Sequence, residues 1–199
     1  MKPQHVVFVC TGNICRSPTA HAVLRQRIAQ HGLDGRLSVS SAGLEAWHSG
    51  EPPDPRSIRH ALQRGYDLSD LRARHLRPVD FERADWVLVM DEGHLARSVR
   101  LCPPQHAHKM HLLTDFCRRH EAMEVPDPYY GAAADFEYVL DLVEDACDGF
   151  LDHLAEAGRS GSGAGGPGRR RGRTRLQARE ARRRRPMKPI TPRPAAASA

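Results

Sequence analysis

Short apolar runs alternate with amphipathic stretches along most of the chain. Residues 6–9 and 86–90 contain no charged side chain, which is typical of strands buried on both faces of a parallel sheet. Residues 37–41 alternate between apolar and polar positions, and residues 109–113 combine apolar side chains with a lysine and a histidine. We predict a strand in each of these four segments.

Apolar residues recur at helical spacing between the predicted strands. We expect helices over residues 17–30, 55–64, 78–83, 92–101 and 135–157. Asp54 and Pro55 suit the N-cap and the first position of the second helix. Because strands and helices alternate, we predict a doubly wound α/β domain with a four-stranded parallel sheet and helices on both faces. Ligands bind such sheets at the carboxyl ends of the strands.

Composition changes after the last predicted helix. The formal net charge is +6, yet residues 159–199 hold 13 of the 30 Lys and Arg and one of the 24 Asp and Glu, which leaves −6 on residues 1–158. We predict a domain over 1–157 and a disordered tail, rich in Arg, Gly, Pro and Ala, over 158–199. The arginines of this tail favour non-specific contact with polyanions such as nucleic acid or anionic lipid.

The 5 cysteines are irregularly spaced and do not indicate a disulfide framework. The first residues lack the apolar core of a signal peptide. No apolar run approaches the roughly 18 residues that a membrane span requires. We therefore expect a reduced, cytoplasmic protein without a membrane span.

The first predicted strand ends at Cys10, which opens the segment Cys-Thr-Gly-Asn-Ile-Cys-Arg-Ser-Pro. Backbone N–H groups of such a loop can face an anion, and Arg16 can bind two oxygens at once. Ser17 and Pro18 begin a helix whose positive end adds to the same field. A cysteine and an arginine alone would more often be a packing residue and a surface charge. The strand before them, the Gly-Asn turn and the following helix favour a phosphate site with Cys10 as nucleophile.

This segment resembles the phosphate-binding loop of the low-molecular-weight protein tyrosine phosphatases, which carry C-x-G-N-x-C-R-S-P directly after the first strand. The resemblance covers about residues 5–155 and implies the phosphotyrosine phosphatase I-like fold. It implies that Cys10 attacks phosphorus as a thiolate, that Arg16 holds phosphoryl oxygens, and that Ser17 assists the departing sulfur. The phosphate-binding residues would be Thr11, Gly12, Asn13, Ile14, Cys15, Arg16 and Ser17.

An acid for the leaving oxygen must come from elsewhere in the chain. The family carries D-P-Y-Y-G in a later loop, and residues 127–131 match it. The resemblance therefore implies that Asp127 is the general acid, although an Asp-Pro pair alone would more often be a surface turn. The expected walls of the substrate pocket are Ile14, Trp47, Tyr129 and Tyr130.

The resemblance also indicates how the loop is supported. The residues expected to do so are Asn13, Ser17, Ser41 and Asp91. Asn13 is expected in a left-handed conformation and bonded to Ser41, while Asp91 is expected to hydrogen bond near Arg16.

Two features of the loop stay open. The family has a histidine where this chain has Leu71, so the loop either lacks one supporting hydrogen bond or gains it from His75. Cys10 and Cys15 could form a protective disulfide under oxidation, or Cys15 could simply pack in a reduced cell.

The sequence thus predicts a phosphatase that acts on phosphotyrosine proteins, tyrosine kinases among them, as a monomer or weak dimer. We expect no cofactor and no metal, because Arg16, backbone amides and the helix dipole neutralise the phosphate. His106, His108 and His111 lack acidic or cysteine partners at the spacing of metal ligands.

Three alternatives remain. A protein-arginine phosphatase of the same family has threonine at the position of Ile14 and lacks the paired tyrosines. The related arsenate reductases need two further cysteines close together, whereas Cys102 and Cys117 are far apart. A non-catalytic anion sensor with a nucleic-acid-binding tail would not need Cys10, Arg16 and Asp127 together.

Overall fold

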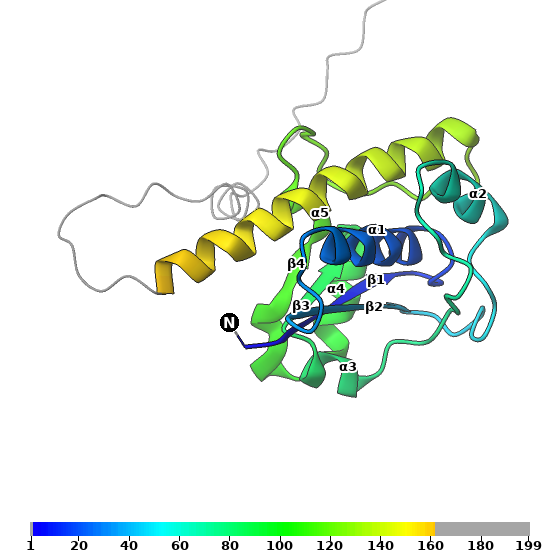
Figure 1. Ribbon diagram of the computed structural model, residues 1–199. Coiled ribbons are helices and arrows are strands. Elements are labelled where there is room, and N and C mark those ends of the chain that lie inside the picture. Colours follow the sequence, from blue (N-terminus) through cyan, green and yellow to red (C-terminus); the bar gives the residue numbers. More distant parts are fainter. Residues whose placement is uncertain (1, 162–199) are drawn as a thin grey trace, which may run out of the picture. The chain divides into compact units, whose positions relative to one another are not determined.

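A parallel sheet forms the centre of residues 2–161, the part of the chain that the computed structural model describes (Figure 1). Its strands are β1 (Gln4–Cys10), β2 (Leu37–Gly43), β3 (Trp86–Val89) and β4 (Met110–Leu112). The spatial order is β2-β1-β3-β4, with all neighbours parallel. The predicted four-stranded parallel sheet is therefore confirmed. The chain passes from β1 to β2 on one side and then from β2 to β3 on the other side of β1, so Cys10 lies at the switch point where such folds bind ligands.

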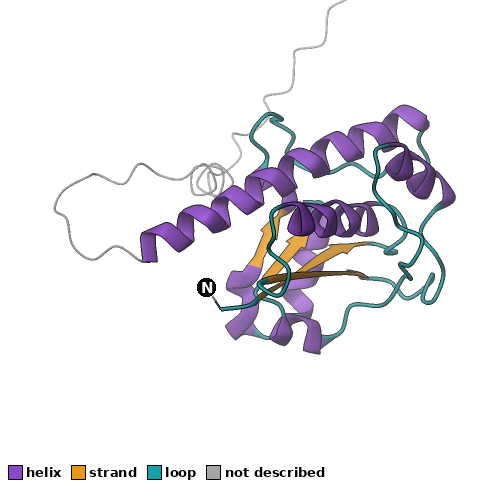
Figure 2. Cartoon of the chain, viewed as in Figure 1, coloured by secondary structure: helices purple, strands orange, loops and turns teal. Residues whose placement is uncertain are grey.

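Helices cover both faces of the sheet (Figure 2). They are α1 (Arg16–Gln30), α2 (Pro55–Gln63), α3 (Pro78–Arg83), α4 (Glu92–Leu101) and α5 (Ala133–Gly161), with the 3-10 helices η1 (Pro104–Lys109) and η2 (Leu113–Phe116). One face is covered by α1 and α5, and the other by α3 and α4. This arrangement confirms the predicted doubly wound α/β class.

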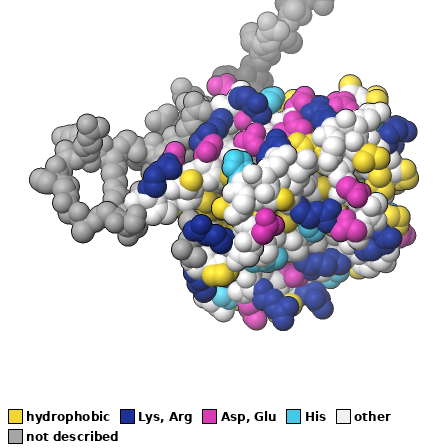
Figure 3. Space-filling model, viewed as in Figure 1, with side chains coloured by type: hydrophobic (Ala, Val, Ile, Leu, Met, Phe, Trp, Pro, Cys, Tyr) yellow, Lys and Arg dark blue, Asp and Glu magenta, His cyan; other side chains and the backbone are white. Residues whose placement is uncertain are grey.

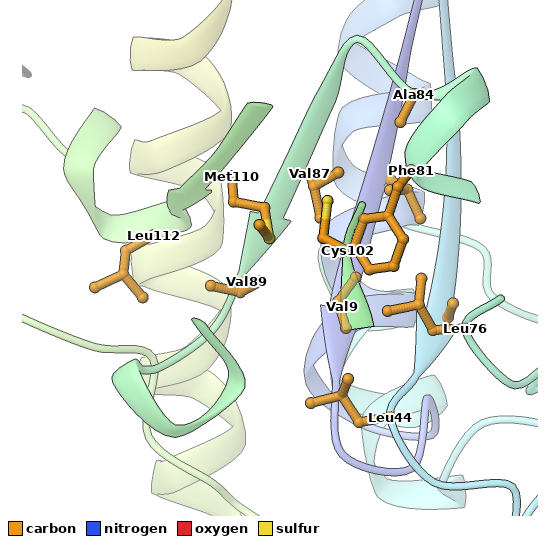
Figure 4. Close-up of a cluster of buried hydrophobic side chains, with 12 residues drawn as sticks. Val9, Leu44, Leu76, Phe81, Ala84, Val87, Val89, Cys102, Met110 and Leu112 are labelled. Atoms are coloured by element: carbon orange, nitrogen blue, oxygen red, sulfur yellow. The ribbon is translucent and has the colours of Figure 1, made fainter. Parts of the chain in front are cut away.

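Side chains that alternate along the strands divide the core into two layers. Val7 and Val9 of β1 pack with Phe81 of α3 and with neighbouring strands in a cluster that Figure 4 shows. Val6 and Phe8 alternate with them and therefore point to the face that α1 and α5 cover. Each of residues 6–9 is at most 1% exposed. Burial on both faces explains why this strand has no polar position.

Several predicted boundaries need correction. β4 is shorter than the predicted 109–113 because 3-10 turns adjoin it on both sides. α5 begins at Ala133, before the predicted 135, and continues to Gly161, past the predicted end at 157. Good helix formers precede Gly158, and no proline follows closely, so this glycine does not end the helix. The predicted tail beyond residue 161 lies outside the described residues.

Ion pairs attach the outer helices to one another. Arg64, the C-cap of α2, donates hydrogen bonds to Glu137, Asp141 and Glu144 of α5. Basic and acidic side chains are accordingly interspersed on the face that Figure 3 shows. Within residues 2–161, no helix is both long and apolar enough to cross a membrane.

Candidate active site

The loop between β1 and α1 surrounds the thiol of Cys10. Cys10 Sγ lies 3.0 Å from Ser17 Oγ, and both residues are buried. Asn13, in the middle of the loop, has φ 57° and is the one non-glycine residue with positive φ among those described. Asparagine tolerates this left-handed conformation, as predicted. The reversal it produces allows successive N–H groups to turn towards one anion.

The side-chain amide of Asn13 closes this loop. Its Nδ2 donates to Ser17 Oγ at 2.8 Å, and its Oδ1 accepts a hydrogen bond of 3.0 Å from the backbone N–H of Arg74. The predicted bond to Ser41 is wrong, because the Ser41 hydroxyl lies 3.3 Å from Nδ1 of His21. Burial lowers the pKa of His21 to about 4. The neutral ring can therefore accept that hydroxyl hydrogen.

The alternatives that centred on Leu71 are also resolved. Leu71 is buried and His75 Nε2 lies 3.2 Å from the carbonyl oxygen of Leu44, so neither side chain supports Asn13. The missing hydrogen bond comes from the main chain of Arg74 instead. A backbone donor leaves no residue-type signal, so the sequence could not reveal it.

Gly43, the last residue of β2, lies in close contact with the backbone of the loop that follows Cys10. A Cβ atom at this position would lie 2.7 Å from Thr11 O and 3.0 Å from Gly12 C. The Gly43 N–H donates to Arg74 O at 2.8 Å, and the Gly43 carbonyl accepts from the Leu76 N–H at 2.7 Å. The segment that supplies the bond to Asn13 is thus fixed to the same glycine. The sequence analysis ended this strand at residue 41 and missed the role of Gly43.

The guanidinium of Arg16 lies between two carboxylates. Its Nη1 donates to Asp91 Oδ2 at 2.8 Å, and its Nη2 donates to Asp127 Oδ2 at 2.9 Å. The predicted contact between Asp91 and Arg16 is present. The Arg16 side chain is 5% exposed and that of Asp127 51%. The exposed carboxylate is the one that a ligand from solution can displace.

Asp91 is held by His94, a residue that the sequence analysis did not single out. Asp91 is the N-cap of α4, and its Oδ1 accepts from the backbone N–H of His94 at 2.7 Å. Its Oδ2 lies 2.9 Å from His94 Nδ1. Burial alone would raise the pKa of Asp91, but the hydrogen bonds from His94 and the charge of Arg16 lower that pKa to about 2. His94 Nε2 lies 2.8 Å from Thr11 Oγ1, so this ring connects Asp91 to the loop that follows Cys10.

A cleft of about 280 Å³ lies above Cys10 and Arg16. It is lined by Cys10, Thr11, Gly12, Ile14, Cys15, Arg16, Trp47, His48, Asp127, Tyr129 and Tyr130. All four predicted pocket residues are present, and His48 is the lining residue that the sequence analysis missed. Trp47 is 72% exposed and Tyr130 is 97% exposed, so both stand at the rim. The rings of Tyr129 and Tyr130 meet nearly edge to face, with centroids 4.9 Å apart.

The second thiol of the loop differs from the first in its surroundings. Burial and the nearby Asp54 raise the pKa of Cys15 to about 12, although a hydrogen bond to Ser57 opposes them. A thiol that stays protonated at neutral pH is a poor nucleophile. Cys10 and Cys15 are both free thiols. Among residues 2–161, no group of three His, Cys, Asp or Glu residues could hold a metal ion.

Comparisons with known proteins find relatives of this chain in both sequence and structure. Residues 5–160 match the family model described as low molecular weight phosphotyrosine protein phosphatase. A low molecular weight protein-tyrosine-phosphatase of Streptomyces coelicolor is 43% identical over 154 residues, which cover 76% of this chain and 93% of that protein. Low molecular weight protein-tyrosine phosphatase A of Mycobacterium tuberculosis is 38% identical over 156 residues, covering 77% and 93%. A crystal structure of a protein tyrosine phosphatase from Entamoeba histolytica has a TM-score of 0.76 at 37% identity and covers 78% of this chain and 99% of that one.

Proposed function

Because the chain belongs to the low molecular weight phosphotyrosine protein phosphatase family, we propose that it hydrolyses phosphotyrosine through a phosphocysteine intermediate on Cys10. The observation that carries this proposal is the convergence of three groups on one cleft. Cys10, Arg16 and Asp127 all line it, although Asp127 comes 111 residues after Arg16 in the chain. They act as nucleophile, phosphate-binding cation and general acid.

In the first step the Cys10 thiolate attacks phosphorus and forms an S–P bond while the bond to the phenolic oxygen breaks. The leaving oxygen takes the proton of the Asp127 carboxyl group. Ser17 stabilises the sulfur anion, because Asn13 already donates to Ser17 Oγ at 2.8 Å. The Ser17 hydroxyl hydrogen is then available to Cys10 Sγ at 3.0 Å.

The phosphoryl group is bound by Arg16 and by the backbone N–H groups of residues 11–17 at the start of α1. Arg16 exchanges its hydrogen bond to Asp127 for one to a phosphoryl oxygen, and it keeps the bond to Asp91. This exchange frees the Asp127 carboxylate from Arg16, and after it has taken up a proton from solvent its carboxyl group can donate that proton to the leaving oxygen. Binding of the substrate and placement of the acid are thus one event.

In the second step a water molecule attacks phosphorus, and the Asp127 carboxylate accepts a proton from it. The S–P bond breaks, the Cys10 thiolate leaves, and orthophosphate is released. The hydrogen bond from Ser17 stabilises the departing sulfur, as it stabilises the attacking one.

The depth and walls of the cleft support an aromatic phosphoester. Cys10 is 3% exposed, so a phosphoserine would have to bring its own backbone into the cleft to reach the sulfur. Tyrosine places the phosphate at the end of a long flat ring, which Tyr129 and Trp47 can flank. Phosphoarginine is also long, but Ile14 offers its guanidinium no hydrogen-bond acceptor in the side chain.

The test compares turnover of phosphotyrosine, phosphoserine and phosphoarginine peptides, alongside p-nitrophenyl phosphate without added metal. We expect the wild-type protein to hydrolyse p-nitrophenyl phosphate and to prefer the phosphotyrosine peptide. Cys10→Ser should abolish both activities, whereas Cys102→Ser, a buried cysteine outside the cleft, should retain them. Undiminished turnover in Cys10→Ser would contradict the mechanism, and a preference for phosphoarginine would contradict the substrate class.

A further inference from the structure

The imidazole of His94 connects Thr11 and Arg16, the two ends of the loop that binds phosphate in the proposed mechanism. Thr11 follows the nucleophile directly, and Arg16 ends the loop. His94 lies 2.8 Å from the Thr11 hydroxyl through Nε2 and 2.9 Å from Asp91 Oδ2 through Nδ1. The same Asp91 oxygen accepts the 2.8 Å hydrogen bond from Arg16 Nη1.

The position of one ring proton of His94 follows from the chemistry of Asp91. With a pKa of about 2, this carboxylate is ionised at neutral pH and can only accept hydrogen bonds. His94 Nδ1 must therefore carry a proton. Nε2, the other ring nitrogen, forms the 2.8 Å hydrogen bond with the Thr11 hydroxyl. The two ring nitrogens thus face two different groups, Thr11 and Asp91, and the ring itself is buried, with His94 4% exposed.

We infer that His94 is a positioning residue for phosphoryl transfer: it fixes Asp91 so that Arg16 stays in place, and it holds Thr11 at the edge of the cradle. The inference rests on the proposed function. Arg16 Nη2 has to release Asp127 when a phosphoryl group binds, so Nη1 needs an anchor that does not move. Asp91 is that anchor, because the His94 backbone N–H donates to Oδ1 at 2.7 Å and the His94 ring nitrogen Nδ1 lies 2.9 Å from Oδ2.

The contribution of the ring can be separated from helix capping. The bond that caps α4 uses the backbone N–H of His94, which every substitution except proline retains. Asparagine can place its amide nitrogen near the position of Nδ1 and keep the bond to Asp91. Glutamine reaches towards the position of Nε2 and Thr11, and phenylalanine keeps the ring shape without either bond.

The experiment measures kcat and KM for p-nitrophenyl phosphate and the inhibition constant of orthophosphate in full-length His94→Phe, His94→Asn and His94→Gln, with melting temperatures. We expect His94→Phe to weaken orthophosphate inhibition and lower kcat/KM by about tenfold each, the effect of losing a hydrogen bond to a charged group. The dependence of rate on leaving group should not change, because Asp127 is untouched. His94→Asn should recover most of the phosphate affinity, and the exposed His108→Asn should match the wild type.

A folded His94→Phe with wild-type kcat, KM and orthophosphate inhibition overturns the inference, even if its melting temperature falls. If His94→Phe does not fold, His94→Gln decides: unchanged phosphate affinity there, with Asp91 unpartnered by the ring, overturns it equally. Thr11→Val combined with His94→Phe should be less than additive, because both remove the same bond. A wild-type protein without phosphatase activity would contradict the proposed function itself, which distinguishes the two failures.

Discussion

Arg16 and Asp127 form a hydrogen-bonded ion pair, in which Nη2 of the arginine lies 2.9 Å from Oδ2 of the aspartate. In the proposed mechanism the first binds phosphate and the second donates a proton. A phosphate dianion must therefore compete with a carboxylate for one guanidinium. The other side of Arg16 stays with Asp91, whose side chain is 22% exposed, compared with 51% for Asp127. The pairing predicts opposite effects on binding and chemistry when Asp127 is removed.

Asp127→Ala should lower kcat by roughly 100- to 10,000-fold for phenyl phosphate and phosphotyrosine, whose leaving oxygens need a proton. The loss should be much smaller for p-nitrophenyl phosphate, because nitrophenolate leaves without one. Orthophosphate should bind several-fold more tightly, because a competing carboxylate is gone. A leaving-group series and product inhibition measure both effects. Equal losses across the series would remove Asp127 as the acid, and weaker phosphate binding would contradict the competition.

Gly43→Ala should disturb the phosphate loop from behind. The new Cβ would stand 2.7 Å from Thr11 O, which is backbone and cannot turn away. Displacing a reactive group by about 1 Å can cost on the order of 100-fold, so we expect a loss of that size in kcat/KM. Gly35→Ala, which meets nothing within 4 Å, is the matched control. It should lose some stability, because its φ is 75°, but keep its kinetic constants. Wild-type kcat/KM in Gly43→Ala would show that the loop tolerates the displacement.

The sequence predicts the candidate site best where the functional residues are neighbours in the chain. Residues 10–18 carry the proposed nucleophile, the turn and the helix start in one segment, so residue types alone indicate an anion site. The buried strands were predictable for a similar reason, since burial on both faces excludes polar residues from residues 6–9. Asp127 is not contiguous with this loop, and its assignment depends on resemblance to a family motif.

The parts that the sequence could not predict depend on packing between distant segments. Gly43 is required because its backbone lies so close to the Thr11 carbonyl that a Cβ atom would not fit, and no local sequence pattern encodes this contact. The partner of Asn13 is a backbone N–H, and the expected partner Ser41 bonds to His21 instead. His94 had a weak local signal, an aspartate three residues earlier that suits an N-cap. That signal indicates the cap but not the connection of the ring to Thr11.

Asp145→Asn should destabilise the fold in a pH-dependent way. Its carboxylate accepts from the N–H groups of Arg118, Arg119 and His120, and its side chain is 2% exposed. Burial would raise the pKa of Asp145, but the hydrogen bonds from His120 and the backbone lower it to about 2. A depressed folded-state pKa means that the stabilisation is present above about pH 4 and is lost as pH falls through 2. We expect Asp145→Asn to lose about 2 kcal/mol at pH 7 and less at pH 3.

Urea denaturation at the two pH values measures this difference. The control is Asp152→Asn, which removes an exposed partner of Arg118 and should cost less than about 1 kcal/mol at either pH. A loss for Asp145→Asn that is the same at both pH values would mean that its charge does not contribute.

Tyr130→Ala should weaken recognition of phosphotyrosine peptides more than that of small esters. Tyr130 is 97% exposed at the rim, where it can cover a peptide outside the cleft. Loss of one aromatic contact of about 1 kcal/mol should raise KM for a peptide roughly fivefold. KM for p-nitrophenyl phosphate should change less, since that ester ends inside the cleft. Tyr138→Ala, an exposed tyrosine of α5, is the control. A uniform change for both substrates would place the effect of Tyr130 on the loop rather than on the peptide.

Ile14→Thr should shift the choice between phosphotyrosine and phosphoarginine. Ile14 lines the cleft and presents only carbon atoms to a substrate. Threonine keeps the β-branch, so the loop backbone should be retained, but its hydroxyl can accept a hydrogen bond from a guanidino N–H. Such a bond to a charged group is worth about 1.5 to 3 kcal/mol when it forms. We therefore expect the ratio of kcat/KM for phosphoarginine over phosphotyrosine peptides to rise by at least about tenfold. Ile14→Val, which shortens the side chain without adding a polar atom, should leave the ratio unchanged. Equal ratios in Ile14→Thr and Ile14→Val would show that the character of this wall does not select the phosphoresidue.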